Sequence, residues 1–363
     1  MKKFKKKWRK LTIEEKTNIL ISQFNLAKSD IDNIRKLKDM KKRLIEAAKL
    51  QFESFGNIHT DLTAWIAGYK SDSVVRQKFG SSLALREKFI HFKNYYPDIK
   101  PTWNDIRNNI KLPKSITEDL AEEVGIHIGD GNLNNIKTKQ GWNSYQYRID
   151  GNLTDEFLYH NEFIKPLMRK LYNCNGYQVI TRNRNSIQSN FRSKLIFCYK
   201  NKIFGLPIGS KINIEIPEPI FENDQFAKRC IVGILDTDFN LNRNISFNGQ
   251  LNSLKVIKQM DNLLTKFSIS HLCKIYGRIG KINIRKEDSI KILEEWKLHN
   301  HKHISKYLIW KEFKTFIPFT HTEERLAVLK GKLSVDDLKS ISNKRKKSSS
   351  LDKNASRLKS QTL

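Results

Sequence analysis

Apolar residues recur at helical spacing through the first hundred residues of the chain. The segment LTIEEKTNILISQFNLA (11–27) opens with Thr12, and Glu15 three residues later completes a capping box, a common start of a helix. A second stretch with the same period follows at 29–52. The pattern predicts an all-helical N-terminal domain over residues 1–108.

Residues 60–79 contain a possible helix-turn-helix. The sequence TDLTAWIAGYKSDSVVRQKF predicts a short helix at 60–67, a turn around Gly68 and a second short helix starting near Asp72. The second helix would present Ser73, Arg76 and Gln77 outward, as a DNA-reading helix does. A packed helical bundle has the same spacing, so the pattern allows either interpretation.

A two-residue alternation of polar and apolar positions begins after Pro113. It is clearest in SYQYRID (144–150), SIQSNF (186–191) and KINIR (281–285), with helix-like stretches between these segments. Alternation of this kind places polar side chains on one face of a strand and apolar side chains on the other. The sequence therefore predicts an α+β region with sheets that have one polar face.

Two segments share the same placement of glycine and aspartate. In VGIHIGDGNL (124–133) Gly125 precedes Asp130 by five residues, and in VGILDTDFNL (232–241) Gly233 precedes Asp238 by five. Small residues on one helical stripe let another backbone approach closer than the usual ~8–10 Å between helix axes. We therefore expect two helices that pack through these stripes and bring Asp130 and Asp238 together at their C-terminal ends.

Two carboxylates at adjacent helix ends are electrostatically unfavourable, because a helix C-terminus already carries partial negative charge. A divalent cation between them removes the conflict, and Mg²⁺ prefers such oxygen ligands. A metal held in this way can activate water beside a phosphodiester. A Gly-Asp-Gly turn at a helix end is the simpler alternative, but two copies with matched spacing favour the metal site.

The charge balance favours a polyanionic partner. The formal net charge is +29, from 67 Lys and Arg against 38 Asp and Glu, and nucleic acid is the first candidate. An anionic membrane and a lysine-rich genome composition are the alternatives. No apolar run approaches the ~20 residues that span a bilayer, and the four cysteines lack CxxC pairing. We expect a cytoplasmic protein without a membrane partner, with a basic, disordered tail at 331–363.

The two repeated segments resemble the signature motif of the LAGLIDADG homing endonucleases, in their two-repeat, single-chain form. EVGIHIGDG (123–131) and IVGILDTDF (231–239) match the nine-residue motif, whose acidic eighth position falls on Asp130 and Asp238. Residues 193–220 resemble the segment between the repeats, and residues 301–333 resemble the C-terminal end of archaeal-type members. The resemblance covers about residues 109–333.

The resemblance implies a fold and an activity. It implies two pseudo-symmetric αββαββα repeats, at 109–222 and 223–330, that form a saddle over double-stranded DNA. A monomer would then cut both strands with Mg²⁺ or Mn²⁺ held by the catalytic pair Asp130 and Asp238. Gly129 and Thr237, directly before the acids, belong to the implied metal site.

The polar strand faces supply the candidate DNA contacts. Arginine in a major groove reads guanine, and asparagine or glutamine reads adenine, although a solvated face has the same composition. Lys211, in GLPIGSK, is a candidate phosphate contact, and which basic residue completes the active site stays open. The remaining candidates are Asn132, Gln146, Arg148, Arg182, Arg184, Gln188, Arg192, Lys281, Asn283 and Arg285.

The second copy departs from the family pattern in two ways. Phe239 stands where the family has glycine, a concern if the position needs positive φ. Only 15 residues separate Asp238 from Ser253, against 24 from Asp130 to Thr154, so the second hairpin must be shorter. Degenerate copies of this fold act as RNA maturases on intron RNA or as DNA-binding regulators, so these functions are the alternative.

Two neighbouring features suggest less chemistry. Asp236 is a third carboxylate near the second motif, and the resemblance implies a structural role for it. The sequence HNHKH (299–303) has three histidines but no Cys or carboxylate at ligand spacing, so a solvated or phosphate-contacting turn is expected rather than a zinc site.

Overall fold

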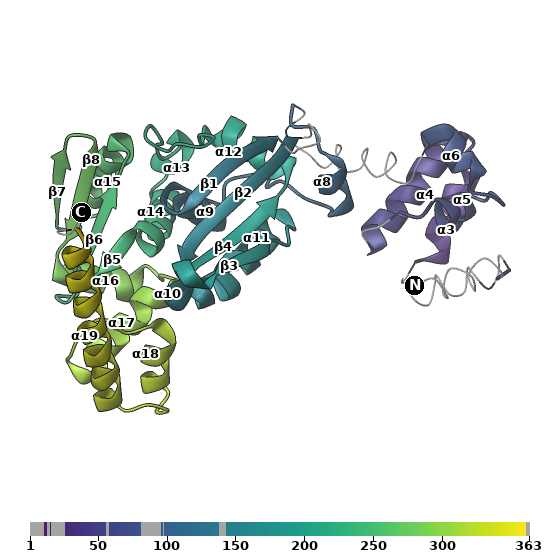
Figure 1. Ribbon diagram of the computed structural model, residues 1–363. Coiled ribbons are helices and arrows are strands. Elements are labelled where there is room, and N and C mark those ends of the chain that lie inside the picture. The colour runs from purple at the N-terminus through teal and green to yellow at the C-terminus, as the bar shows by residue number, and fades with distance from the viewer. Residues whose placement is uncertain are drawn as a thin grey trace. The chain divides into compact units, whose positions relative to one another are not determined.

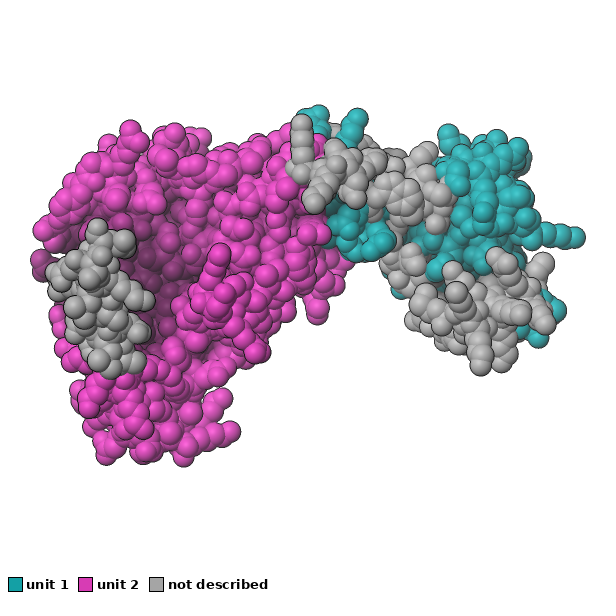
Figure 2. Space-filling view, viewed as in Figure 1, with its two compact units in different colours: residues 1–112 teal, residues 113–363 magenta. Residues whose placement is uncertain are grey.

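The computed structural model describes residues 11, 12, 15, 26–55, 58–80, 96, 98–137 and 143–360. The chain forms two compact units, Met1–Leu112 and Pro113–Leu363, which Figure 2 colours separately. The boundary lies four residues beyond the one expected from the sequence.

Unit 1 is helical wherever it has regular structure in the described residues. Its helices, labelled in Figure 1, are α3 (Lys28–Lys36), α4 (Met40–Phe55), α5 (Thr60–Ile66), α6 (Ser73–Phe79) and α8 (Trp103–Arg107). The expected capping box is present: the Thr12 amide donates to Glu15 Oε2 at 2.7 Å, and the Glu15 amide donates to Thr12 Oγ1 at 3.2 Å. The helix expected after it lies mostly outside the described residues.

The turn between α5 and α6 has the geometry that the sequence predicts. Gly68 has a φ of +86°, which glycine adopts readily. The Arg35 guanidinium lies 5.0 Å from the Trp65 ring centroid and donates to the carbonyl oxygens of Trp65 and Ile66, at 3.0 and 3.3 Å. This arrangement fixes the C-terminal end of α5. The α6 side chains of Ser73, Arg76 and Gln77 are exposed.

Unit 2 contains two copies of an αββαββα order, as predicted. The first copy consists of α9 (Glu118–Gly129), β1 (Gly131–Lys137), β2 (Asn143–Asn152), α10 (Leu153–Leu158) continued by η1 (Tyr159–Ile164) and α11 (Lys165–Tyr172), β3 (Tyr177–Thr181), the turn η2 (Arg182–Arg184), β4 (Ser186–Arg192) and α12 (Lys194–Phe204). The second consists of α14 (Asp224–Asp238), β5 (Phe239–Leu241), β6 (Phe247–Leu251), α15 (Leu254–Lys266), β7 (His271–Tyr276), β8 (Ile279–Ile284) and α16 (Lys286–Glu295). The short helix α13 (Glu218–Phe221) precedes α14.

Each copy forms a four-stranded antiparallel sheet with the same strand order. The orders are β1-β2-β4-β3 and β5-β6-β8-β7, so equivalent strands occupy equivalent places. Figure 1 shows the two sheets with α9 and α14 near each other. The expected trimming of the second hairpin is present, because β5 and β6 have three and five residues against seven and ten in β1 and β2.

The predicted alternation separates a core face from a polar face in both sheets. Tyr147 and Ile149 of β2 are buried, and Gln146 and Arg148 lie on the opposite face. In β8 the side chains of Ile282 and Ile284 are buried, while Lys281 and Asn283 are exposed. Each sheet thus presents a row of polar side chains away from its hydrophobic core.

The C-terminal segment corrects the expectation of a disordered tail. After α17 (His301–Phe313) and α18 (Thr322–Leu329), residues Val335–Ser360 form α19. Leu338 is fully buried, and the Arg345 guanidinium donates to both Glu324 carboxylate oxygens at 2.5 and 2.7 Å. A few well-placed contacts therefore hold the first part of this helix, although its composition is polar.

The helices of the described residues are all too short or too polar to cross a membrane.

Candidate metal and nucleic-acid site

Helices α9 and α14 touch backbone to backbone at two glycines. A Cβ placed on Gly125 would lie 2.0 Å from the Cys230 carbonyl oxygen. A Cβ on Gly233 would lie 2.3 Å from the Glu122 carbonyl oxygen. Because real Cβ atoms essentially never come within 3.0 Å of such atoms, any larger residue would force the helices apart. The glycines thus set how closely the two helices approach.

The same close packing continues to the C-terminal ends of the helices. A Cβ on Gly129 would lie 1.9 Å from Thr237 Oγ1 and 3.6 Å from Asp238 Cγ. Thr237 Oγ1 donates to the Gly233 carbonyl oxygen at 2.8 Å. Asp130 follows Gly129 as the C-cap of α9. The structure therefore places Gly129, Thr237 and both repeat aspartates around one point.

Both carboxylates have raised pKa values. The pKa of Asp130 is raised well above its usual value, by burial first and then by the negative charges of Glu156 and Asp238. Burial raises the pKa of Asp238 to about 6, against the attraction of Lys211 and Lys302. A divalent cation would relieve this strain, and carboxylates with main-chain carbonyl oxygens are ligands that Mg²⁺ and Mn²⁺ accept. The residues present therefore fit a metal site.

Lys211 lies at the C-terminal end of α9. Its ammonium group donates to the carbonyl oxygens of Ile128 and His127, at 3.0 and 3.4 Å, and contacts that of Gly129. Burial lowers the pKa of Lys211, while the charges of Asp238 and Asp130 oppose the shift. The predicted phosphate contact thus stands beside the carboxylate pair, where the main-chain oxygens already face a cation.

Lys302 occupies the matching place at the end of α14, and the sequence analysis did not select it. Its ammonium group donates to Glu156 Oε1 at 2.8 Å and lies 3.5 Å from the Thr237 carbonyl oxygen. Burial alone would lower the pKa of Lys302, but Glu156 and Asp130 outweigh it and raise that pKa. The two lysines have equivalent places in the structure: each follows the last helix of its αββαββα copy by seven residues, from Phe204 to Lys211 and from Glu295 to Lys302.

Glu156 joins the site from α10 of the first repeat and was also missed. Its carboxylate accepts hydrogen bonds from the main-chain amide of Asn152 at 2.7 Å, from the side-chain Nδ2 of Asn300 at 3.0 Å and from Lys302. The residue is buried, and its charge raises the pKa of Asp130 more than any other charge does. Glu156, a residue of the first repeat, therefore holds Lys302 of the second repeat in place.

Two further polar residues take equivalent positions beside the carboxylates. The Asp150 amide donates to the Asp130 carbonyl oxygen at 3.2 Å. Because Gly131 pairs with Ile149 in one sheet and Phe239 pairs with Gly249 in the other, Gln250 is the counterpart of Asp150. The two halves of the site thus differ, with a carboxylate in one and an amide in the other.

Phe239 does not require the left-handed conformation that a glycine would permit. Its φ is −99° and its ψ is 156°, which is extended backbone, and its side chain is buried. The ring lies where a side chain at position 249 would stand, since a Cβ on Gly249 would come within 2.4 Å of it. The first repeat has small Gly131 opposite large Ile149, and the second reverses the sizes. The concern about backbone strain at Phe239 is therefore unfounded.

The sequence HNHKH is not the solvated turn expected from the sequence. His299 Nδ1 lies 2.6 Å from Glu122 Oε1, and its amide donates to Asp236 Oδ2 at 2.8 Å. The Asp236 carboxylate also accepts a hydrogen bond from the main-chain amide of Asn300 at 3.1 Å. Burial raises the pKa of Asp236 to about 7. Ligand atoms of Glu122, Asp236 and His299 lie within 4.8 Å of one another. Their mutual bonds tie the loop before α17 to the helix pair.

Many of the predicted DNA contacts lie on the polar sheet faces. In the first sheet, the register places on one face Asn132, Gln146, Arg148, Gln188 and Arg192. In the second sheet, Lys281 and Asn283 are exposed on the equivalent face. The other three candidates lie elsewhere: Arg182 and Arg184 are exposed in the turn η2, and Arg285 is the exposed N-cap of α16.

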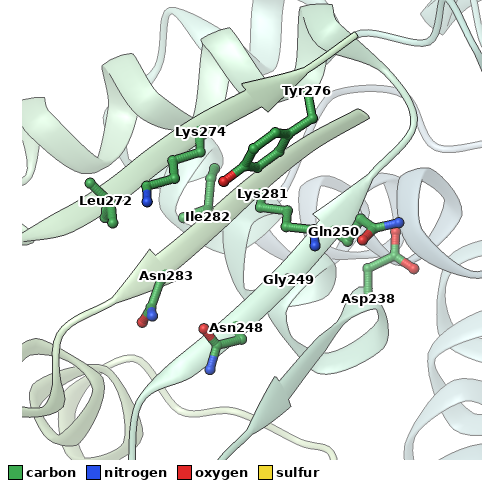
Figure 3. A pocket seen from close by; sticks show the side chains of 10 residues that line it. All are labelled: Asp238, Asn248, Gly249, Gln250, Leu272, Lys274, Tyr276, Lys281, Ile282 and Asn283. Carbon is green, nitrogen blue, oxygen red and sulfur yellow. The ribbon is translucent and has the colours of Figure 1, made fainter. Parts of the chain in front are cut away.

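A depression of about 550 Å³ lies over the polar face of the second sheet. Figure 3 shows that its lining comes from β6, β7 and β8 and that it reaches Asp238. Its polar lining includes Asn248, Gln250, Lys281 and Asn283. The polar face of the second sheet is thus continuous with the carboxylate site.

No protein-family model and no curated protein matches the sequence. Solved structures with similar folds include the homing endonuclease I-DmoI in complex with DNA and Mn, at 18% identity and a TM-score of 0.38, covering 48% of this chain and 94% of that one. I-SmaMI, bound to an uncleaved DNA target with calcium ions, has 12% identity and a TM-score of 0.37, covering 62% and 97%.

The N-terminal LAGLIDADG domain of DUF199/WhiA has 12% identity and a TM-score of 0.33, covering 50% of this chain and 83% of that one. These solved structures thus include the homing endonuclease I-DmoI and a LAGLIDADG domain.

Proposed function

We propose that the chain is a site-specific endonuclease that binds a long double-stranded DNA target as a monomer and cuts both strands with a divalent metal. The observation that carries the proposal is the pair of carboxylates, Asp130 and Asp238, at the adjoining ends of two helices in backbone contact. Each end also has a lysine, Lys211 or Lys302, directed at the last carbonyl oxygens of the helix. Each half-site therefore has one aspartate and one lysine.

In this proposal Asp130 and Asp238 hold Mg²⁺ or Mn²⁺, with the main-chain oxygens of Gly129 and Thr237 beside them. The bound metal would activate water and stabilise charge on the phosphodiester oxygens. Lys211 and Lys302 place positive charge next to the scissile phosphates, and Glu156 keeps Lys302 protonated and in place. Both aspartates are half-buried, which limits the competing water around the site.

The polar sheet faces would place the target over this site. Arginine, lysine and amide side chains alternate with core residues along the strands, which suits contacts in a major groove. The net charge of +29 supplies the non-specific attraction to phosphates, so binding should weaken steeply with salt. The exposed Ser73, Arg76 and Gln77 of α6 are proposed as an additional DNA contact.

The test is a selection for cleavage from a library of randomised duplexes. The full chain is expected to cut a subset of targets with Mg²⁺ or Mn²⁺ and to bind the same targets without cutting in Ca²⁺. Asp130→Asn and Asp238→Asn should retain binding and lose cleavage by at least about a hundredfold. Asp119→Asn and Asp224→Asn, at the other ends of the same helices, are the matched controls. Normal cleavage by either Asn variant at the site would refute the assignment.

The alternative is a protein that binds without cutting, as an RNA maturase acting on intron RNA or as a DNA-binding regulator. The short β5 and β6 favour it, because they offer a smaller groove-facing surface than β1 and β2. This alternative predicts metal-independent binding and intact strands throughout the selection. Double-strand breaks made by the wild-type chain and absent from Asp130→Asn would exclude it.

A further inference from the structure

The two sheets carry corresponding rows of side chains across their polar faces. In the first sheet, strand pairing aligns Asn132, Arg148, Asn190 and Tyr177. In the second sheet, the corresponding row starts two residues after Asp238. Strand pairing there aligns Asn240, Asn248, Asn283 and Leu272. Each row begins two residues after its aspartate, so the rows would face equivalent base pairs in the two halves of a bound duplex.

The row of the first sheet is occupied by contacts within the protein. Arg148 Nε donates to Asp150 Oδ2 at 3.0 Å, which holds the guanidinium beside the carboxylate site. Asn190 Oδ1 accepts from Gln146 Nε2 at 2.5 Å. Arg192, from the neighbouring row, lies 5.1 Å from the ring centroid of Tyr177. This face combines arginines with preformed amide and carboxylate partners.

The row of the second sheet differs from that of the first in its residue types and in how many of its side chains are hydrogen-bonded within the protein. Among the residues that the structure describes, the side-chain amides of Asn248 and Asn283 have no hydrogen-bond partner, whereas Asn240 Oδ1 accepts from Lys306 at 2.9 Å. Leu272 at the end of the row is 54% exposed. The four strands of this sheet contain no arginine. Two free amides and an aliphatic side chain thus line the depression beside Asp238 (Figure 3).

This chemistry matches one kind of base pair. An asparagine amide forms two hydrogen bonds with the N6 and N7 atoms of adenine, and an aliphatic side chain contacts the thymine methyl group. Guanine is read mainly by arginine or lysine. The lysines of this sheet, Lys274 and Lys281, lie opposite each other on neighbouring strands in the next row and not in the asparagine row. The asparagine row therefore offers two adenine readers and a thymine contact.

We infer that Asn248, Asn283 and Leu272 select consecutive A·T base pairs in the half-site under the second sheet. The equivalent base pairs under the first sheet, which face Arg148, accept G·C. The inference rests on the proposed DNA binding and adds its specificity: a target with an A·T step in one half and no such step at the mirrored place. Neither half-site is then a copy of the other.

The test is a binding selection with the full chain, randomised duplexes and Ca²⁺, followed by sequencing of the bound pool. The wild-type chain is expected to enrich A·T at adjacent positions in one half only. Asn248→Ala and Asn283→Ala should each reduce the preference for adenine at one of these positions by about tenfold. Asn190 is the counterpart of Asn283 in the first sheet. The variant Asn190→Ala should therefore leave the adenine preference in the half under the second sheet unchanged.

A second variant tests the assignment by gain rather than loss. Asn248→Arg copies the residue at the equivalent place of the first sheet and should shift one enriched position from adenine to guanine. Enrichment of G·C by the wild type at the positions that respond to Asn248, or unaltered preferences in both alanine variants, would overturn the inference. A wild-type chain that enriches no duplex would instead refute the proposed DNA binding, and the inference with it.

Discussion

Gly131 and Phe239 occupy equivalent places after the two repeat aspartates, and the chain accommodates their different sizes on the neighbouring strand. Gly131 lies opposite Ile149, and Phe239 lies opposite Gly249. A Cβ on Gly131 would lie 2.4 Å from His127 Cα, so the first position has no room for a side chain. The exchange keeps the volume of the pair, which well-packed interiors tolerate best.

A double-mutant cycle at this pair measures the compensation. Phe239→Gly should lower the free energy of unfolding by about 3–5 kcal/mol, because it empties a buried ring site. Gly249→Ile should also destabilise, because its side chain meets the Phe239 ring. Together the substitutions rebuild the arrangement of the first repeat, so urea unfolding should give a smaller loss than the sum, by roughly 1–3 kcal/mol. Simple additivity would contradict the compensation.

The lysines of the site are predicted to act on cleavage and not on affinity. Lys211→Met and Lys302→Met each remove a positive charge beside the carboxylate pair, so single-turnover cleavage should slow by roughly a hundred- to a thousandfold. Binding of the selected duplex in Ca²⁺ should change much less. Lys266→Met, which removes an exposed lysine paired with Asp224, serves as the control. Equal losses of binding in all three variants would count against a role in catalysis.

At the scale of elements, local patterns in the sequence predicted much of the fold. The repeated Gly–Asp spacing located α9 and α14, and the alternation in 144–150 located β2 and its two faces. The relation of Lys302 to Glu156 could not be found in this way, because the two residues are 146 positions apart and meet only through the packing of α17 against α10. The first turns of α19 were missed because polar composition outweighed isolated apolar positions such as Leu338.

The approach of α9 to α14 should be highly sensitive to one methyl group. Gly125→Ala and Gly233→Ala each introduce a Cβ within 2.3 Å of a backbone oxygen of the partner helix, which no side-chain rotation relieves. We expect a loss of at least about 2 kcal/mol in the free energy of unfolding for each variant. Gln225→Ala, on the exposed face of α14, is the control. If thermal unfolding of the glycine variants matches that control, the helices are not in backbone contact.

At the scale of the whole molecule, the net positive charge is distributed over two compact units. Unit 1 presents the exposed side chains of Ser73, Arg76 and Gln77 on α6, and unit 2 carries the carboxylate site. If both bind the same duplex, the protected length of DNA must exceed what two small sheets can cover. Unit 1 then adds contacts without taking part in cleavage.

This contribution is measurable by footprinting on a selected duplex. The combined variant Ser73→Ala, Arg76→Ala and Gln77→Ala should shorten the protected region at one end, while the cut positions stay the same. It should also reduce the slope of the logarithm of the affinity against the logarithm of salt by about one, the share of one phosphate contact. Lys36→Ala, which removes an exposed lysine at the end of α3, controls for charge alone. An unchanged footprint would remove unit 1 from the DNA interface.

In the proposed function, a cation intervenes between Asp130 and Asp238. Burial raises the pKa of Asp238 from 3.8 to about 6, so the folded chain binds more protons than the unfolded chain between these values. Without metal, the free energy of unfolding should therefore fall as pH rises from about 4 to about 6 and stay reduced above that. The strain from this carboxylate is at most on the order of 3 kcal/mol.

The most direct measurement is the free energy of unfolding at pH 7.5, with and without Mg²⁺, for the wild type, Asp238→Asn and the control Asp224→Asn. Without metal, Asp238→Asn should be more stable than the wild type, because it removes a half-buried charge whose pKa is raised. Mg²⁺ should stabilise the wild type and the control and leave Asp238→Asn nearly unchanged. A metal-free wild type that is more stable than Asp238→Asn, with equal gains from Mg²⁺ in all three proteins, would contradict the account.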